Sequence, residues 1–306
     1  MVDLKIELPS SFFLEEERDG HLVSSKIKEL WAVQLDLLNE FDRVCKKYNL
    51  KYVLDFGTLL GAIRHKGYIP WDDDIDVGML REDYDKLMEI GPKEFKKPYF
   101  LQTPYTDKRF DEGVNKLRRT DTMYLSQHNL VHYPKYNLGI FIDIFVYDNI
   151  PSDGKSDKPI IAQTQTDFLH RYVLCNRPSL LSDGKKYPAR LLRYLYYKMR
   201  YGSARRVYAK QEEFAKSFKP EGTVASVMYF VLNKRPRNCF IDIIDVPFEN
   251  LMMPVPANYD ELLRSLYGDY MTPVKGGSDH VIASFDTCRS YKELIRQRYK
   301  WQGKED

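Results

Sequence analysis

The stretch GTLLGAIRHKGYIPWDDDIDV, residues 57–77, decides how this chain folds and where its chemistry lies. It places a glycine-flanked helical turn before a basic run, followed by four aspartates in five positions. A strand sends alternate side chains to opposite faces, so Asp74 and Asp76 would project together while Ile75 and Val77 turn toward a core. Two adjacent carboxylates repel each other unless a divalent cation lies between them. The stretch therefore predicts a metal site at the start of a strand.

A second apolar strand, GIFIDIFV at residues 139–146, contains one carboxylate, Asp143. A lone aspartate in such a run is poorly explained as surface or as core, and we interpret it as a third ligand of the same cation. Oxygen ligands without histidine or cysteine nearby favour Mg²⁺, with Mn²⁺ as the alternative, over zinc. Such a site indicates phosphoryl transfer, and Asp143 is our candidate to accept the proton of the attacking hydroxyl. An exposed acidic corner is the competing interpretation, which Asp143 and the glycine turn disfavour.

Basic residues near these aspartates are candidate phosphate ligands. Arg64 lies between the helical turn and the aspartates, and alternation places Lys116 and Arg118 on one face of a strand. Ordinary surface clusters would look the same, so that alternative stays open. Asp72 and Asp73 are assigned a secondary role, as caps, water ligands or solvated side chains.

Composition places the chain among globular proteins with one large domain or two ordinary ones. It has 306 residues, 43% of them hydrophobic and 30% charged. The net charge of +3 is too small to indicate nucleic-acid binding, and we expect none. Four scattered cysteines predict buried reduced thiols and a cytoplasmic location. The sequence shows neither a signal-peptide pattern nor an apolar run of about 18 residues, so we expect no membrane span. His280 is interpreted as structural.

Periodicity and turn residues predict the order of the elements. Helices are expected over residues 25–48, 58–64, 82–90 and 259–267, and strands over 52–55, 75–79, 99–102, 113–125, 139–146 and 240–246. Residues 155–235 are poor in glycine and rich in helix formers, which predicts a helical region there.

The part of that region from Pro188 to Lys216 combines leucine, tyrosine and arginine. Its apolar residues at helical spacing favour a helix that packs on a core and leaves a basic back in solvent. The other interpretation is a surface, from Arg190 to Lys210, that meets anionic lipid or a phosphorylated acceptor and so makes a peripheral contact at the inner face of the plasma membrane.

Residues 54–77, LDFGTLLGAIRHKGYIPWDDDIDV, closely resemble the signature of the LicD family. That family belongs to the nucleotidyltransferase-fold superfamily, and the fukutin-related proteins are its distant members. Three further segments are similar to the family: REDYDKL at 81–87, GIFIDIF at 139–145 and PVPANYDELLRSLYGDYMTP at 254–273. A match of this length is far more specific than an isolated pair of aspartates.

The resemblance implies an α+β fold, in which a nucleotidyltransferase-like mixed β-sheet is flanked by helices, and the composition of residues 155–235 adds a helical insertion to it. Residues 1–154 would form the catalytic core with its N-terminal helix, 155–235 a basic helical insertion, and 236–306 a segment that completes the core. Gly57 and Thr58 would lie near the nucleotide phosphates. Asp74 and Asp76 would be the paired metal ligands, and Asp143 the third acid.

The resemblance also implies an activity. LicD proteins transfer phosphocholine from CDP-choline to a glycan such as teichoic acid, capsule or lipopolysaccharide, and related members move other phosphoalcohols or phosphosugars. We therefore expect a Mg²⁺-dependent transfer from a CDP-activated donor to a glycan or lipid-linked glycan, with release of CMP. The alternatives are a nucleotidyltransferase or sugar-phosphate transferase that uses the same aspartates, and a non-catalytic protein that docks on a membrane. No motif selects the alcohol, the acceptor or the oligomeric state.

Overall fold

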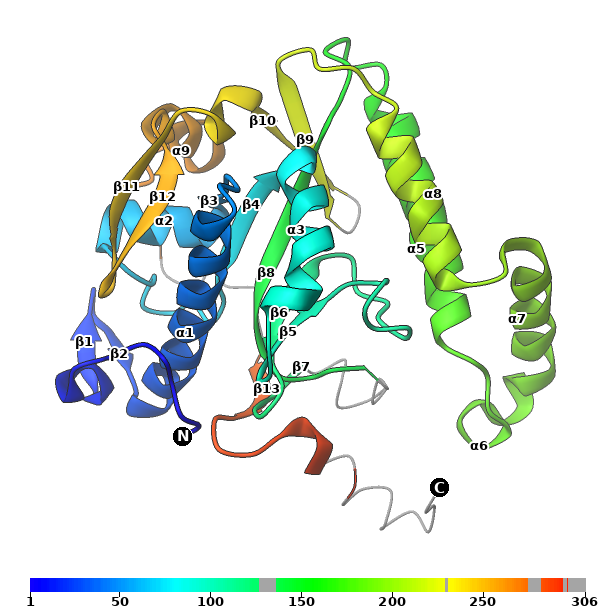
Figure 1. Ribbon diagram of the computed structural model, residues 1–306, viewed down its shortest axis with the longest axis horizontal. Coiled ribbons are helices and arrows are strands. Elements are labelled where there is room, and N and C mark those ends of the chain that lie inside the picture. The colour runs from blue at the N-terminus through cyan, green and yellow to red at the C-terminus, as the bar shows by residue number, and fades with distance from the viewer. Residues whose placement is uncertain (127–135, 229–230, 275–281, 294–295, 297–306) are drawn as a thin grey trace. The chain divides into compact units, whose positions relative to one another are not determined.

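The computed structural model describes residues 1–126, 136–228, 231–274, 282–293 and 296, so His280 lies outside the described residues. The chain divides into two compact units. The first comprises Met1–Leu101, Lys116–Phe145 and Asn238–Asp306, and the second comprises Gln102–Asn115 and Val146–Arg237. The architecture is the expected α+β combination of a mixed sheet with helices (Figure 1). In the part of the chain that the structure describes, no helix is long and apolar enough to cross a membrane.

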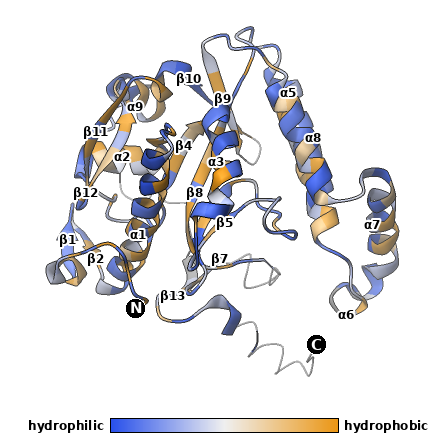
Figure 2. Ribbon diagram, viewed as in Figure 1, coloured by the Kyte–Doolittle hydropathy of each residue, from blue (hydrophilic) through white to orange (hydrophobic). Residues whose placement is uncertain are grey.

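The main sheet of the first unit is built around two neighbouring strands, β4 (Asp76–Leu80) and β8 (Ile140–Asn149). On one side, β4 pairs antiparallel with β3 (Val53–Leu54), and on the other side β8 pairs with β6 (Asn115–Arg119), which pairs with β5 (Tyr99–Gln102). All five residues of β4 are buried, so this strand forms part of the core (Figure 2).

Other described strands of this unit form two-stranded antiparallel ladders outside the main sheet. They are β1 (Glu16–Arg18) with β2 (His21–Val23), β7 (Met123–Ser126) with β13 (Ile282–Asp286), and β11 (Ile243–Phe248) with β12 (Leu251–Pro256). The predicted strand at 240–246 starts late, because a 3-10 turn, η3 (Arg237–Phe240), occupies its beginning. A similar turn, η1 (Ser10–Phe13), lies near the N-terminus.

The helices of the first unit confirm the periodicity argument. They are α1 (Ser25–Lys47), α2 (Phe56–His65), α3 (Arg81–Glu94) and α9 (Tyr259–Tyr267). Local chemistry starts two of them, since the Ser24 hydroxyl accepts the Ile27 N–H at 3.3 Å and an Asp55 carboxylate oxygen accepts the Phe56 N–H at 2.9 Å. The apolar positions of α1 are almost all buried, so α1 packs as a central helix rather than a surface one.

Two strand predictions need correction. Strand β4 begins at Asp76, so Asp74 precedes the strand and does not share it. The single strand expected at 113–125 is two strands, β6 and β7, because the Thr122 N–H turns back to the Arg119 carbonyl at 3.3 Å and interrupts the extended backbone.

The second unit is mainly helical and ends in a hairpin. Its elements are α5 (Asp157–Cys175), α6 (Leu180–Asp183), η2 (Gly184–Lys186), α7 (Tyr187–Tyr201), α8 (Ala204–Lys216), β9 (Thr223–Met228) and β10 (Val231–Pro236). Helices α5 and α8 lie side by side (Figure 1). The end of β8 pairs antiparallel with β9, and β9 with β10. The hairpin was not predicted within the helical region.

The basic stretch from Pro188 to Lys216 is two helices rather than one. The chain leaves α7 at Gly202, whose φ of +78° lies in the left-handed region that glycine adopts readily. The Ser203 hydroxyl then accepts the Arg206 N–H at 3.3 Å and starts α8. The two halves of the stretch can therefore face different surroundings.

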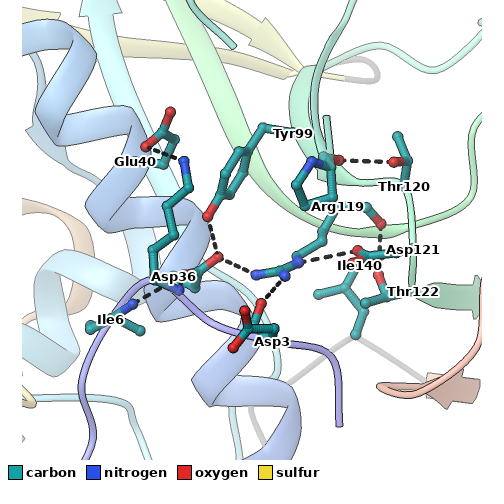
Figure 3. Close-up of polar contacts among 12 residues, drawn as sticks. Asp3, Ile6, Asp36, Glu40, Tyr99, Arg119, Thr120, Asp121, Thr122 and Ile140 are labelled. Atoms are coloured by element: carbon teal, nitrogen blue, oxygen red, sulfur yellow. Dashed lines mark hydrogen bonds and ion pairs between the residues drawn. The ribbon is translucent and has the colours of Figure 1, made fainter. Parts of the chain in front are cut away.

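Within the first unit, contacts around a buried ion pair hold the N-terminal segment against the rest of the unit (Figure 3). The guanidinium of Arg119 donates to the Asp36 carboxylate and to the Asp3 carbonyl. Asp36 also accepts the Tyr99 hydroxyl at 2.7 Å and the Lys5 N–H at 2.6 Å. Burial and the Asp36 carboxylate raise the pKa of Tyr99, so its hydroxyl stays protonated as a donor.

All four cysteines are free thiols. Cys45, Cys175 and Cys239 are buried, as predicted, whereas Cys288 is exposed. Burial raises the pKa of the Cys45 thiol, which keeps that thiol protonated and inert.

Candidate active site

Three carboxylates converge in the first unit. Oxygen atoms of Asp74, Asp76 and Asp143 all lie within 4.8 Å of one another. Asp74 precedes β4, Asp76 opens β4, and Asp143 lies on the neighbouring strand β8. The Asp143 N–H donates to the Ile75 carbonyl at 2.8 Å, and this bond sets the register that brings the two segments together. The convergence predicted from the sequence is therefore present in the structure.

The electrostatics of this cluster fit a cation. Burial raises the pKa of Asp76, and the carboxylates of Asp74 and Asp143 raise it further. Carboxylates packed this closely are favourable only when a proton or a cation is shared among them. Three oxygen donors within this distance match the hard ligands that Mg²⁺ and Mn²⁺ prefer, so the residues present fit the expected metal.

The glycine turn lies beside the acidic segment. The Thr58 hydroxyl accepts the Asp76 N–H at 2.8 Å, and the Asp55 N–H donates to the Asp76 carbonyl at 3.0 Å. A Cβ at Gly57 would lie 2.7 Å from an oxygen of Asp72, so only glycine allows this close approach without a shift. The start of α2 and the start of β4 are thus fixed to each other by the backbone of Asp76.

The two cations of β6 lie on one face, as alternation predicted. The ammonium of Lys116 contacts the Asp143 carboxylate, and it lies 3.8 Å from the centre of the Phe141 ring. The Arg118 guanidinium lies 4.8 Å from the same ring centre and donates to the Gly139 carbonyl at 2.7 Å. Lys116 therefore belongs to the acidic cluster, and Arg118 shares with it the contact to the Phe141 ring.

Arg64 lies in the last turn of α2. Its guanidinium donates to the Tyr270 carbonyl at 2.8 Å, in the segment that follows α9. Burial lowers the pKa of Arg64, although a guanidinium remains charged at neutral pH. This contact connects Arg64 to the C-terminal segment, and its assignment as a phosphate ligand remains a prediction.

Three further residues hold the acidic segment, and sequence reasoning missed all of them. The Trp31 indole N–H donates to the Asp72 carbonyl at 3.0 Å, and the Gln34 amide donates to the Asp73 carbonyl at 2.7 Å. From β7, the Tyr124 hydroxyl donates to the Asp73 carboxylate at 2.9 Å. A polar Gln34 inside the apolar face of α1 was the one sequence signal that could have indicated this role.

Asp72 and Asp73 form a second acidic group with Asp74. Carboxylate oxygens of all three lie within 4.8 Å of one another. Burial raises the pKa of Asp72, and its neighbours Asp74 and Asp73 add to the effect. The group of carboxyls around Asp74 therefore extends beyond the three predicted ligands.

Comparison with known proteins identifies this arrangement. A model of the LicD/FKTN/FKRP nucleotidyltransferase domain matches residues 49–189, which contain all three aspartates. The chain therefore contains a nucleotidyltransferase domain of the LicD/FKTN/FKRP kind. The lipopolysaccharide cholinephosphotransferase LicD of Haemophilus influenzae is 26% identical over 255 residues, which cover 80% of this chain and 91% of that relative.

The chain is also similar to other proteins over shorter segments. An uncharacterized protein of Rickettsia prowazekii is 35% identical over 137 residues, or 45% of this chain and 46% of that protein. The ribitol 5-phosphate transferase FKRP of Homo sapiens is 39% identical over 51 residues, or 17% of this chain and 10% of that protein.

Proposed function

We propose that this LicD-family transferase moves phosphocholine from a CDP-activated donor to a hydroxyl of a cell-surface glycan precursor, in a reaction that depends on Mg²⁺. The acceptor hydroxyl attacks the phosphorus distal to the nucleoside, and CMP leaves. The observation that carries the proposal is the convergence of Asp74, Asp76 and Asp143 within 4.8 Å, because such a site suits a divalent cation that binds a diphosphate.

The relatives support the choice of reaction and of donor. Two of them are named for the transfer of a phosphoalcohol, one of cholinephosphate and one of ribitol 5-phosphate. Choline is favoured over ribitol because the cholinephosphotransferase matches 80% of this chain, whereas the ribitol 5-phosphate transferase matches 17%. By the same similarity, the proposed acceptor is a lipopolysaccharide precursor, with teichoic acid and capsule precursors as the alternatives.

Asp74, Asp76 and Asp143 would hold the cation, with Mn²⁺ as an acceptable substitute for Mg²⁺. When bound, the cation would offset charge on the diphosphate and on the leaving CMP. Asp143 is proposed to take the proton of the acceptor hydroxyl, and the Lys116 ammonium beside it orients that carboxylate.

The donor phosphates are proposed to lie at the start of α2, between the glycine turn and the cations of β6. Gly57 and Thr58 lie in the first turn of α2, whose N-terminal end favours negative charge. Lys116, Arg118 and Arg64 are the proposed cationic contacts with those phosphates. The free thiols are compatible with a reducing compartment, so the proposal places the reaction in the cytoplasm.

The test is a product assay with the purified full chain. The protein is incubated with Mg²⁺, a glycan extract and, in turn, CDP-choline, CDP-ribitol and a set of nucleotide sugars. We expect CMP and a phosphocholine-labelled glycan from CDP-choline, and little product when EDTA replaces Mg²⁺. Glu89→Gln, on the exposed surface of α3, serves as a charge-matched control for Asp143→Asn.

Three results would contradict the proposal or one of its parts. Free phosphocholine, together with a glycan that carries CMP, would show attack at the other phosphorus and thus a nucleotidyltransferase. Absence of both turnover and donor binding across the whole set would instead favour a non-catalytic protein. Equal activity of Asp143→Asn and Glu89→Gln would remove Asp143 from the mechanism.

A further inference from the structure

The outward face of α7 in the second unit is apolar and exposed. Side chains at spacings of three and four residues share one face of a helix. The exposed fractions on this face are 70% for Leu192, 45% for Leu195, 58% for Tyr196 and 82% for Met199. None of the residues of α7 is buried. Large apolar side chains gathered on one exposed face indicate an interaction surface.

The opposite face of α7 makes the contacts with the rest of the unit. The rings of Tyr197 and Tyr201 lie 4.8 and 4.4 Å from the His170 ring of α5, measured between centres. The interpretation of this segment as a core-packing helix with a basic back is therefore wrong for α7. Its tyrosines pack on α5, and Leu192 and Met199 point away from that contact.

The charge around this face is of one sign. Residues 184–211 contain nine lysines and arginines and no acidic residue. The other 278 residues hold 38 of the 47 basic side chains and all 44 acidic ones. The positive charge of the chain is therefore concentrated in one segment, although the net charge of the whole is small.

Six of these cations are exposed on α7 and on the turn before it: Lys185, Lys186, Arg190, Arg193, Lys198 and Arg200. Arg190 is paired with Asp183. Among the described residues, no carboxylate lies within ion-pair distance of the other five. Five cations are thus available to an external anionic surface.

We propose that α7 is an interfacial helix that binds a membrane surface rich in anionic phospholipid. An amphipathic helix with exposed leucine, methionine and tyrosine on one face and arginine and lysine beside it can bury the apolar side chains at the headgroup boundary. The long basic side chains reach the lipid phosphates while their stems stay in apolar surroundings. A protein partner fits less well, because protein interfaces are depleted of lysine and three of the five available cations are lysines. This binding is separate from the transfer reaction and needs no turnover.

The experiment is sedimentation of the purified full chain with vesicles. One vesicle population contains phosphatidylglycerol and phosphatidylcholine, and the other contains phosphatidylcholine alone. We expect binding to the first that weakens in high salt, because screening reduces the attraction of exposed charges, and much weaker binding to the second.

Charge and apolar contact are separated by two sets of variants. Arg193→Gln, Lys198→Gln and Arg200→Gln together should weaken binding on the order of 100-fold, since each basic residue near an anionic surface contributes about a fivefold gain. The matched control replaces Lys93, Lys96 and Lys97, three exposed lysines of the first unit, with glutamine. Circular dichroism of each variant checks that the helices are intact.

Leu192→Gln with Met199→Gln should weaken binding by about 10-fold or more, because both side chains lose their burial in the lipid. Its matched control is Leu14→Gln with Leu22→Gln, two leucines whose exposed fractions are 64% and 61%. Failure of the wild-type chain to sediment with anionic vesicles would overturn the proposal, as would equal losses in the controls. A concentration-dependent oligomer that these α7 changes abolish, without vesicle binding, would assign the face to a second copy instead.

Discussion

The first unit contains two sets of buried carboxylates, and their negative charge is compensated in different ways. Asp36 receives a guanidinium from Arg119, a hydroxyl from Tyr99 and main-chain N–H groups from the N-terminal segment (Figure 3). Asp76 faces other carboxylates, which raise its pKa in addition to the effect of burial. A buried charge is tolerated when it is paired, so Asp36 is complete within the chain. The cluster at Asp76 gains most from a cation supplied from outside, and this difference distinguishes a structural acid from a candidate ligand.

The largest expected effect comes from breaking the complete pair. Arg119→Met leaves the Asp36 charge buried without its cation and should lower the free energy of unfolding by about 3–5 kcal/mol. Urea denaturation measures the loss. Arg43→Met is the control, because Arg43 pairs with Glu40 at a half-exposed site and should cost less than about 1 kcal/mol. Adding Asp36→Asn to Arg119→Met should restore part of the stability, and no recovery would contradict the pairing argument.

At the cluster of Asp74, Asp76 and Asp143, the change Asp76→Asn should affect stability and activity in opposite directions. The transfer rate should fall on the order of 100-fold or more, because a ligand of the cation is lost. Without divalent cations, the same change should raise the melting temperature, because it replaces a buried carboxyl that ionises unfavourably among like charges with a neutral amide. Product assay and thermal denaturation in EDTA measure the two effects, with Glu89→Gln as the control. A fall in both quantities would mean that Asp76 is a structural acid of the same kind as Asp36.

A smaller effect is expected at the hydroxyl that holds Asp76 in place. Thr58→Val removes the acceptor of the Asp76 N–H and leaves a buried donor without this bond, which should cost about 1–3 kcal/mol. Thr58→Ser keeps the hydroxyl and should retain most of the stability. Chemical denaturation of the two variants distinguishes the hydrogen bond from the packing of the side chain. A larger loss in Thr58→Ser than in Thr58→Val would assign the effect to the methyl group, which valine keeps and serine lacks.

The smallest expected effect is the dependence of stability on pH. Because the pKa of Asp76 is raised, the native chain keeps a proton at pH values where the unfolded chain, with a pKa of about 3.9, has lost it. The native state then binds more protons, so the stability of the metal-free protein should fall as the pH rises above that value. Asp76→Asn should make the stability of the metal-free protein less dependent on pH. Melting temperatures in EDTA, measured between about pH 5 and pH 8, provide the test.

Added Mg²⁺ should raise the melting temperature more at about pH 8 than at about pH 5, since cation and proton compete for the same oxygens. A gain that is the same at both values would indicate a metal site away from Asp76. The Asp36 network should show no such response to Mg²⁺, because Arg119 already occupies the position of the cation.

The helices of the first unit were predictable because their causes are local. The apolar spacing of α1 and its cap at Ser24 lie within a short stretch of chain. The hairpin of β9 and β10 was missed, although Thr223, Val224 and Val227 are β-branched residues that favour a strand. Averaging the composition over residues 155–235 hid this short signal among helix formers.

The acidic residues of the candidate site were predictable from the sequence. The residues that hold the acidic segment in place were not. The spacing of Asp74 and Asp76 and the isolation of Asp143 in an apolar strand are visible in the sequence. The contacts from Trp31 and Gln34 to the acidic segment join residues about forty positions apart, and no local pattern encodes them.

The sequence by itself determined the acidic residues, the main helices and the concentration of basic charge in residues 184–211, because each of these is a property of neighbouring positions. The tertiary structure decided which carboxylates meet, that Lys116 joins Asp143 while Arg119 joins Asp36, and that the apolar face of α7 points outward. These outcomes depend on strand pairing and on contacts between helices, which bring together residues far apart in the chain. The physical reason is that the periodicity of helices and strands fixes which side chains share a face. Tertiary packing alone fixes which other residues that face contacts.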